Sequence, residues 1–221
     1  LRRCTLEETC EVLEAIDQDD PVHMCEELGD VLTQVVFHGD MEQDAGRFTL
    51  EDVYDGICKK LILRHPHVFG STVVGSTGEV LNNWDAIKRV EKDQKTFTDT
   101  LEAVPKNLPA NWRAEKLMKK ASKAGFAWDN GFQAIDKLAA ETVELGQAMV
   151  DGSNVAEELG DTLFAAVGVC YTLGLDPETV LHEACEKFIR RFAAMEQRAG
   201  STSLDTLSKE QLLTLWNDCK P

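Results

Sequence analysis

Apolar residues recur at helical spacing along almost the whole chain. Within one stretch, for example, they stand three or four residues apart, at Leu28, Val31, Leu32, Val35 and Val36. No segment alternates apolar and polar residues over a useful length, and Val73-Val74 is too short to form a strand. The pattern therefore predicts an all-α protein built as helical bundles.

Start and stop signals divide this pattern into separate helices. Thr49 with Asp52, Ser76 with Glu79 and Ser208 with Gln211 have the spacing of helix-capping pairs. The expected helices cover residues of about 5–17, 21–43, 49–66, 76–92, 110–124, 132–150, 155–173, 177–197 and 208–219. The stretch 97–109 contains two prolines and is predicted to be a linker.

Pairs of carboxylates interrupt the apolar pattern at matching places in the two halves of the chain. The sequence Glu-Glu-Leu-Gly-Asp occurs at Glu26–Asp30 and again at Glu157–Asp161. A second pair, with members three residues apart, precedes each copy, and such residues share one face of a helix. The two resulting quartets are Glu8, Glu11, Glu27 and Asp30 in the first half and Glu141, Glu144, Glu158 and Asp161 in the second. Folding alone does not favour such a concentration of charge, so each quartet predicts a bound cation.

Basic and aromatic residues repeat together with the acids. A Lys-x-x-x-Arg pair occurs at Lys60 and Arg64 and again at Lys187 and Arg191, and a Trp-x-x-x-Lys pair occurs at Trp84–Lys88 and Trp216–Lys220. Matching features lie 127 to 133 residues apart, which indicates an internal duplication. We expect a first repeat over residues 1–96, a linker with a connecting helix over 97–128 and a second repeat over 129–221. Gly29 and Gly160, inside the acidic helices, are expected to allow close approach of another backbone.

The ligand types restrict the metal. All ligands of the quartets are oxygens, and none of the five histidines follows a glutamate by three residues, as a di-iron carboxylate bundle would require. Oxygen ligands alone select Mg²⁺ or Mn²⁺ over zinc or iron. Because magnesium usually retains positions for phosphate oxygens, the nearby Lys and Arg pairs point to a phosphorylated substrate. One such pair alone is more often an ordinary solvated helix face, and the tryptophans alone are more often core residues.

Composition narrows the possible partners. The net charge is −16 and the isoelectric point is about 4.7, which argues against nucleic acid and against anionic membrane surfaces. Seven cysteines without CxxC spacing resemble buried thiols of a reducing cytoplasm more than a disulfide framework. No apolar run has the length of a membrane span. The first residue, Leu1, is not a methionine, so we expect the chain to begin inside a longer protein.

Several motifs together resemble the MazG family of nucleoside triphosphate pyrophosphohydrolases. They are Thr5–Glu11, Glu26–Asp30, Arg64–Phe69, Gly125–Trp128, Glu157–Asp161 and Glu186–Phe192. The resemblance covers essentially the whole chain. It implies an all-α, tandem-repeat, homodimeric, cytoplasmic enzyme that uses Mg²⁺ to cleave NTPs and dNTPs into monophosphate and pyrophosphate.

The resemblance also implies roles for individual residues. The family's metal ligands fall on Glu141, Glu144, Glu158 and Asp161, its phosphate-binding residues on Lys187 and Arg191, and its late tryptophan on Trp216. The corresponding first-half residues are Glu8, Glu11, Glu27, Asp30, Lys60, Arg64 and Lys88.

Two departures from the family pattern bear on the site. Full-length members carry a Cys-Pro-Trp-Asp segment before the first acidic helix. The matching segment before the second acidic helix is Phe126–Asp129, whereas the first-half segment would fall before Leu1. We therefore expect the first site to be incomplete in this chain and the second half to carry most of the catalysis. Cys185 stands where some members have asparagine.

Two other functions compete with this interpretation. One is a related pyrophosphohydrolase with a narrower substrate, either phosphoribosyl-ATP or a single dNTP. The other is a non-catalytic scaffold whose repeats bind metal for folding or serve a partner protein. The presence of a complete quartet in both halves argues against the scaffold.

Overall fold

The computed structural model describes residues 1–72 and 74–220, without the side chains of Leu81 and Asn82. The described residues form α-helices, one short 3₁₀ helix and connecting turns, and no strand occurs among them. The α-helices are α1 (Arg2–Asp17), α2 (Pro21–Asp44), α3 (Leu50–Arg64), α4 (Pro66–Phe69), α5 (Thr77–Glu91), α6 (Phe97–Glu102), α7 (Ala110–Ser122), α8 (Gly131–Asp151), α9 (Val155–Leu173), α10 (Pro177–Ala199) and α11 (Lys209–Asp218), with the 3₁₀ helix η1 (Leu204–Thr206) before α11. The predicted all-α class is confirmed. The chain forms two compact units, Leu1–Asp93 and the residues from Gln94 onwards.

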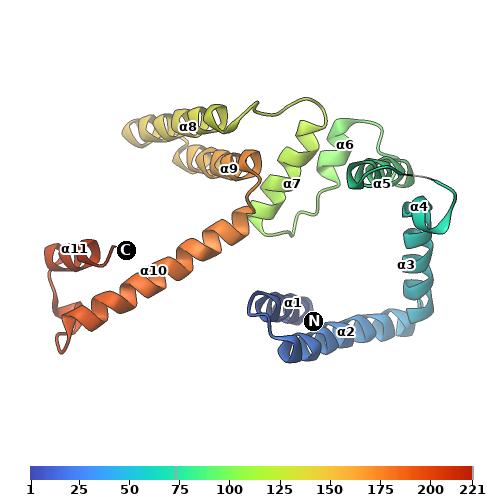
Figure 1. Cartoon of the computed structure of the whole chain (residues 1–221), viewed down its shortest axis with the longest axis horizontal. Helices are drawn as coiled ribbons and strands as arrows, with labels where there is room; N and C mark the ends of the chain where they lie inside the picture. Colours follow the sequence, from blue (N-terminus) through green and yellow to red (C-terminus); the bar gives the residue numbers. More distant parts are fainter. Residues whose placement is uncertain (73, 221) are drawn as a thin grey trace. The chain divides into compact units, whose positions relative to one another are not determined.

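The first unit begins with a hairpin of α1 and α2 (Figure 1). Asp20 caps α2 because its carboxylate accepts hydrogen bonds from the backbone N–H groups of Val22 and His23, both at 3.0 Å. Helix α3 follows after a short turn that ends at a capping box formed by Thr49 and Asp52. Helix α5 packs on α3. The hairpin thus carries the acids of the first half, and α3 with α5 carries its cations.

The second unit repeats the hairpin as α8 and α9 (Figure 1). Its described core lies where α7 meets α9 and consists of Ala114, Met118 and Val167, with Trp128 and Tyr171 packed against it. Gly168 is required at this contact, because a Cβ atom there would lie 2.8 Å from ring atoms of Trp128. Helix α10 then leads to α11, with which it packs.

The buried apolar residues of both hairpins are mostly small. The buried apolar residues of their helices are Ala15 in the first and Ala134, Ala148, Ala165 and Val167 in the second. Alanine lets two helices approach closely but buries little apolar surface. The larger apolar residues of the same helices point elsewhere, and many of them are exposed, such as Leu32, Val143 and Leu163.

Three features differ from the sequence-based expectations. The stretch 97–109 is not a linker throughout, because α6 forms there, with a capping box of Thr96 and Asp99. Pro66 ends α3 as expected but also begins the short helix α4. A Cβ atom added at Gly29 or Gly160 would meet nothing within 4 Å, so no backbone of the described chain approaches them. The sequence analysis judged Val73-Val74 too short to form a strand, and Val73 lies outside the described residues.

Candidate active site

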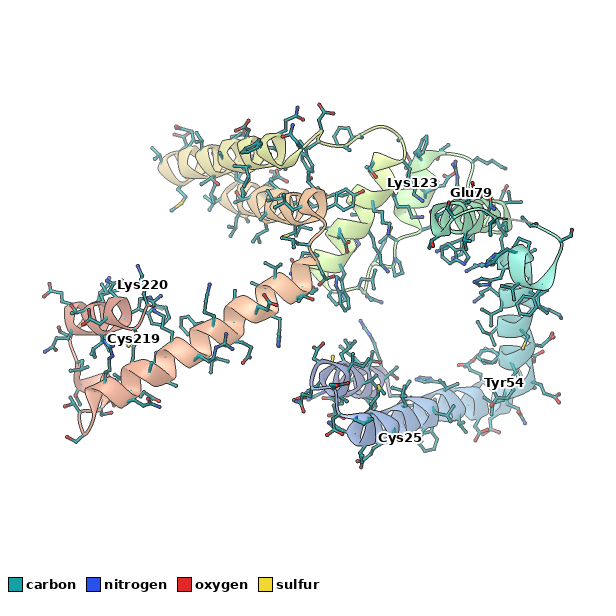
Figure 2. All side chains as sticks on the ribbon, in the orientation of Figure 1. Cys25, Tyr54, Glu79, Lys123, Cys219 and Lys220 are labelled. Atoms are coloured by element: carbon teal, nitrogen blue, oxygen red, sulfur yellow. The ribbon has the colours of Figure 1, made fainter. Side chains whose placement is uncertain are left out.

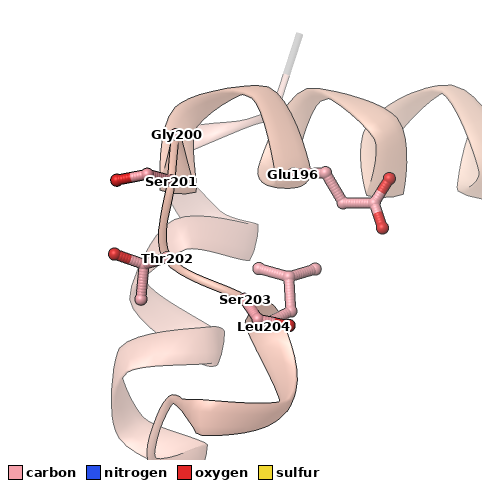
Figure 3. Close-up of a pocket in the computed structure, with 6 residues that line it drawn as sticks. All are labelled: Glu196, Gly200, Ser201, Thr202, Ser203 and Leu204. Carbon is pink, nitrogen blue, oxygen red and sulfur yellow. The ribbon is translucent and has the colours of Figure 1, made fainter.

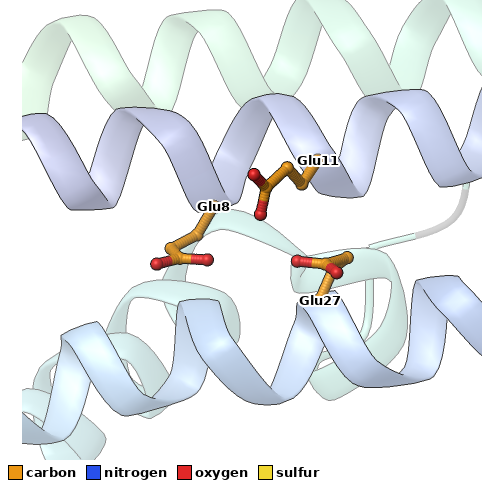
Figure 4. Close-up of side chains that lie close together, drawn as sticks. All are labelled: Glu8, Glu11 and Glu27. Atoms are coloured by element: carbon orange, nitrogen blue, oxygen red, sulfur yellow. The ribbon is translucent and has the colours of Figure 1, made fainter.

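Three glutamates of the first half converge between α1 and α2. Carboxylate oxygens of Glu8, Glu11 and Glu27 all lie within 4.8 Å of one another, and Figure 4 shows the side chains pointing toward a common centre. Glu8 and Glu11 come from α1, and Glu27 comes from α2. The three-residue spacing and the hairpin together produce this cluster, as the sequence predicts.

Glu27 is the buried member of this cluster, with 7% of its surface exposed. One of its oxygens pairs with His23 Nε2 at 3.0 Å, and the other, Oε2, is buried without a hydrogen-bond partner. Desolvation raises the pKa of Glu27, and a side-chain hydrogen bond with Glu11 that favours the protonated form, together with the charge of Glu11, raises it further. The pKa of Glu8 is also raised, by desolvation and then by the charge of Asp30.

The second half builds the same arrangement between α8 and α9. Carboxylate oxygens of Glu141, Glu158 and Asp161 lie within 4.8 Å of one another. Glu141 is the buried member, 6% exposed, and forms an ion pair with Lys137 one helical turn before it. Desolvation raises the pKa of Glu158, and the charges of Glu144 and Asp161 raise it further.

The fourth member of each quartet lies at the edge of its cluster. Asp30 is not among the three converging carboxylates of the first half, yet its charge raises the pKa of Glu8 and of Glu27. Glu144 stands in the same relation to Glu158 in the second half. All eight predicted acids therefore belong to two electrostatically coupled groups.

These groups suit a divalent cation. Every converging ligand is a carboxylate oxygen, which is the donor type that hard divalent ions prefer. The buried Oε2 of Glu27 has no partner within the described structure, and an unsatisfied buried oxygen is costly. A cation at the centre would satisfy this oxygen and offset the desolvation and the repulsion that raise the carboxylate pKa values.

The predicted cations of the second half gather where α10 meets α11. The guanidinium carbon of Arg191 lies 3.7 Å from the ring centroid of Trp216, and Arg191 Nε donates to the carbonyl oxygen of Trp216 at 2.9 Å. The ring of Phe188 lies 5.0 Å from that of Trp216. Lys187 is exposed on α10. Trp216 therefore supports Arg191 in this structure.

The first half has a matching cluster between α3 and α5. Arg64 lies over the ring of Trp84 at 5.3 Å, and Lys88 Nζ lies over the same ring at 4.7 Å. Arg64 also forms two hydrogen bonds with Glu91, the last residue of α5. Lys60 is exposed one turn before Arg64 on α3.

The acids and the cations of the second unit do not meet within one chain. Figure 1 shows α10 leading away from the α8–α9 hairpin, with α11 at its distant end. Within the described part of this unit, the acidic cluster pairs with Lys137 and Arg191 bonds to Trp216, and no ion pair joins the two groups.

Sequence analysis missed three residues that contact the predicted site. They are His23 and Lys137, each four residues before a buried glutamate, and Glu91, seven residues after Trp84. The four-residue spacing was a usable signal, because such residues are neighbours on a helix. Glu91 had no such signal, since its partner Arg64 lies on another helix.

Other surface features lie apart from these residues. A shallow cavity of about 250 Å³ at the end of α10 is lined by Glu196, Gly200 and the residues 201–204, none of them a predicted site residue (Figure 3). All seven cysteines are free thiols, including Cys25 on α2 and Cys219 after α11 (Figure 2). Among the described residues no single helix is long and apolar enough to cross a membrane, whereas α9 and α10, bent by 108°, pass that test only as a pair.

Comparison with known proteins agrees with this architecture of two acidic hairpins in an all-α chain. The MazG nucleotide pyrophosphohydrolase domain matches residues 1–69 and 132–194. A nucleoside triphosphate pyrophosphohydrolase of Escherichia coli K12 is 40% identical over 98% of this chain and 84% of its own length. The nucleoside triphosphate pyrophosphohydrolase/pyrophosphatase MazG of Thermotoga maritima is 39% identical over all of this chain and 85% of its own length. An uncharacterised protein, YabN of Bacillus subtilis, is 40% identical over all of this chain and 46% of its own length.

The fold, the paired carboxylate clusters and these relatives together define a tandem-repeat, all-α hydrolase that acts on nucleoside triphosphates. The chain belongs to the MazG nucleotide pyrophosphohydrolase family.

Proposed function

We propose that this protein is a Mg²⁺-dependent nucleoside triphosphate pyrophosphohydrolase that cleaves NTPs and dNTPs between the α and β phosphates. The observation that carries the proposal is the convergence of carboxylates in both halves, each around a buried glutamate, on a chain of the MazG family. The products are a nucleoside monophosphate and pyrophosphate.

In the second half, the cation would be held by Glu141, Glu144, Glu158 and Asp161. Mg²⁺ fits the oxygen-only ligand set, and Mn²⁺ can replace it. When bound, this ion supplies positive charge that neutralises the triphosphate. The equivalent ligands of the first half are Glu8, Glu11, Glu27 and Asp30.

The chain's own cations would bind the phosphate groups. Arg191 presents a planar set of donors that suits phosphate oxygens, and its stacking on Trp216 limits the orientations of the guanidinium. Lys187 adds a point charge one turn away. Together they would stabilise negative charge on the leaving pyrophosphate while a glutamate of the quartet accepts the proton of the attacking water.

We further propose that the repeats comprise residues 1–96 and 129–221, joined by residues 97–128. Each repeat would contain one metal site and one phosphate-binding set, the first set being Lys60, Arg64 and Lys88. Trp216 of the second set would keep its arginine in place for the substrate.

We propose that the active form is a homodimer. The described chain exposes 15790 Å². Two entirely separate compact bodies of half its mass would expose only about 12,000 Å². The excess, roughly 3,600 Å², is more than the roughly 1,000–2,500 Å² that one chain usually contributes to an obligate interface, so even a large dimer interface could be accommodated. A second copy is the natural cover for the large apolar residues that the alanine-packed hairpins leave exposed.

The partner copy would also complete the site. Lys187 and Arg191 lie on α10, which leads away from the α8–α9 hairpin of the same unit (Figure 1), and the two clusters carry opposite charges. We propose that the cations of one copy serve the carboxylates of the other.

We also propose that the protein works in the cytoplasm, without nucleic acid or membrane partners. The free thiols favour the reducing cytoplasm, and the charge of −16 disfavours nucleic acid and anionic membranes as partners.

A pyrophosphate-release assay with eight nucleotides, four NTPs and four dNTPs, tests the function. We expect Mg²⁺-dependent release from several of them and almost none from Glu158→Gln. Release from a single dNTP, or only from phosphoribosyl-ATP added as a ninth substrate, would identify a narrower enzyme. If none of the compounds released pyrophosphate, the result would contradict the enzyme and favour the non-catalytic scaffold.

A further inference from the structure

The two carboxylate oxygens of Glu27 have different surroundings. Oε1 lies 3.0 Å from His23 Nε2, whereas Oε2 is buried and has no hydrogen-bond partner within the described structure. Only 7% of the surface of Glu27 is exposed, so water compensates Oε2 poorly. One oxygen of this residue is therefore already engaged by the protein, and the other is available to a cation.

Local helix geometry places His23 beside Glu27. The Asp20 carboxylate accepts a hydrogen bond from the backbone N–H of His23 at 3.0 Å and holds that residue in the first turn of α2. Glu27 follows four residues later, on the same face of the helix. An ionised carboxylate can only accept hydrogen bonds, so His23 Nε2 donates to Oε1 whenever Glu27 is ionised.

We propose that His23 restricts Glu27 to one metal-binding oxygen and thereby makes the first repeat select Mg²⁺ or Mn²⁺ over Ca²⁺. His23 acts through Glu27 and is a positioning residue. The inference rests on the proposed function, because it takes Glu8, Glu11 and Glu27 as ligands of a divalent cation.

The physical reason is the difference in coordination between these ions. Mg²⁺ requires a nearly octahedral shell and retains positions for water and phosphate, and Mn²⁺ suits the same kind of oxygen site. Ca²⁺ is larger, takes about 6–8 oxygens and accepts both oxygens of one carboxylate. A glutamate that offers a single oxygen therefore suits the smaller ions, whereas a glutamate with both oxygens free can also bind Ca²⁺ in a bidentate manner.

The restraint on Glu27 is particular to the first repeat. Under the offset of 131 residues that relates Glu27 to Glu158, His23 corresponds to Asn154, so the second repeat has no imidazole at this position. There the buried glutamate is Glu141, which pairs with Lys137. The effect of His23 must therefore be measured at the first site alone.

A purely structural role is the competing explanation, since the same contact ties together one turn of α2. Loss of a structural contact would weaken the binding of all divalent ions in the same proportion. Loss of the restraint on Oε1 would instead change the ratio of Ca²⁺ affinity to Mn²⁺ affinity. This ratio separates the two explanations.

The test uses the full chain with the second site silenced by Glu141→Gln and Asp161→Asn. The electron paramagnetic resonance signal of free Mn²⁺ reports its binding, and competition with Ca²⁺ gives the ratio of the two affinities. His23→Ala should shift this ratio roughly tenfold toward Ca²⁺. His23→Gln keeps a side-chain N–H donor and should restore most of the parent's ratio. An unchanged ratio in a folded His23→Ala chain would overturn the inference.

Two controls keep the result interpretable. His38→Ala removes another histidine of α2, one that is exposed, and should leave the ratio unchanged. An equal shift in His38→Ala would show a general effect and contradict a specific role of His23. If His23→Ala does not fold, His23→Leu removes the donor and keeps a bulky side chain for the same comparison.

The failure of the proposed metal site would look different. In that case the silenced chain would not bind Mn²⁺, or Glu27→Gln would leave Mn²⁺ binding unaltered. The inference about His23 fails by itself when Glu27→Gln removes the Mn²⁺ site and His23→Ala leaves the ratio of affinities as it was.

Discussion

At the scale of single residues, the acidic clusters oppose folding. Glu8, Glu27 and Glu158 all have raised pKa values, and desolvation is the largest cause for each. The ionised form of each residue is therefore less favourable in the folded chain than in the unfolded chain. Such an arrangement gains stability when a cation is bound, so the residues that cost stability in the free protein are those we propose as metal ligands.

Glu158→Gln should reduce turnover about 100-fold or more, because it removes a proposed ligand. In EDTA at pH 7 the same change should increase the free energy of unfolding, because an ionised group with a raised pKa destabilises the fold. This gain should shrink as the pH falls through the raised pKa toward 4.5, where the native glutamate becomes neutral. Urea unfolding at several pH values measures it, and a loss of stability at pH 7 would argue against charge repulsion.

The two repeats should contribute unequally to catalysis. Glu141→Gln should reduce turnover at least tenfold more than Glu8→Gln, because Met118, Val167 and Trp128 pack the second acidic hairpin against α7 and hold its ligands in place. Steady-state kinetics of the two variants, at saturating Mg²⁺, make the comparison. Equal losses would mean that the two sites work together, and a larger loss in Glu8→Gln would reverse our assignment.

At the scale of the helix, ends are fixed by local hydrogen bonds. Thr49 accepts from the backbone N–H of Asp52, and the Asp52 carboxylate accepts from the backbone N–H of Thr49. The backbone hydrogen bond from Thr49 is also the main cause of the lowered pKa of Asp52. This reciprocal capping sets the start of α3, the helix that carries Lys60 and Arg64.

Thr49→Ala should cost about 1 kcal/mol of stability, while Thr9→Ala, inside α1, should cost little. The contribution of Asp52 should be present above its ordinary pKa of 3.8 and should be lost as the pH falls through its lowered pKa. Asp52→Asn should remove this pH dependence. Thermal unfolding between pH 2.5 and 6 measures both effects, and an unchanged profile in Asp52→Asn would contradict the capping account.

Most helices and their ends could be predicted from the sequence, because capping residues and apolar periodicity are local features. Helix α9 has the predicted bounds Val155–Leu173, and α2 begins at Pro21 as expected. Helix α6 was missed because the segment 97–109 was interpreted from its two prolines, although Pro105 and Pro109 both lie after the helix and Thr96 with Asp99 forms a capping box at its start. The convergence of carboxylates within each hairpin could be predicted, because acids three residues apart share one face of a helix. The contact of Glu91 with Arg64 depends on how α5 packs on α3, which no local pattern specifies.

At the scale of the whole molecule, exposed apolar side chains on α8 and α9 are the main support for the proposed homodimer. On α8 and α9, Val143 is 72%, Val150 81% and Leu163 62% exposed. Exposed apolar surface of this extent is characteristic of protein interfaces. The buried apolar residues of the two hairpins are mostly alanines, so the proposed second copy would bury the larger side chains that these helices expose.

Leu163→Glu should therefore shift the protein from dimer to monomer and reduce activity along with it. A buried charge without a partner at an apolar interface strongly disfavours association. Gln147→Glu introduces the same charge at a polar position of the hairpin and should remain dimeric. Sedimentation equilibrium distinguishes the species, and a wild-type chain that is monomeric at micromolar concentration would contradict the proposed assembly.

The central claim is attack of water at the α phosphorus of a nucleoside triphosphate. Turnover of ATP in H₂¹⁸O with Mg²⁺, followed by mass spectrometry of the products, tests it most directly. The account predicts AMP that carries one ¹⁸O atom and pyrophosphate without label. ADP with orthophosphate as the first products, or label in pyrophosphate, would contradict it.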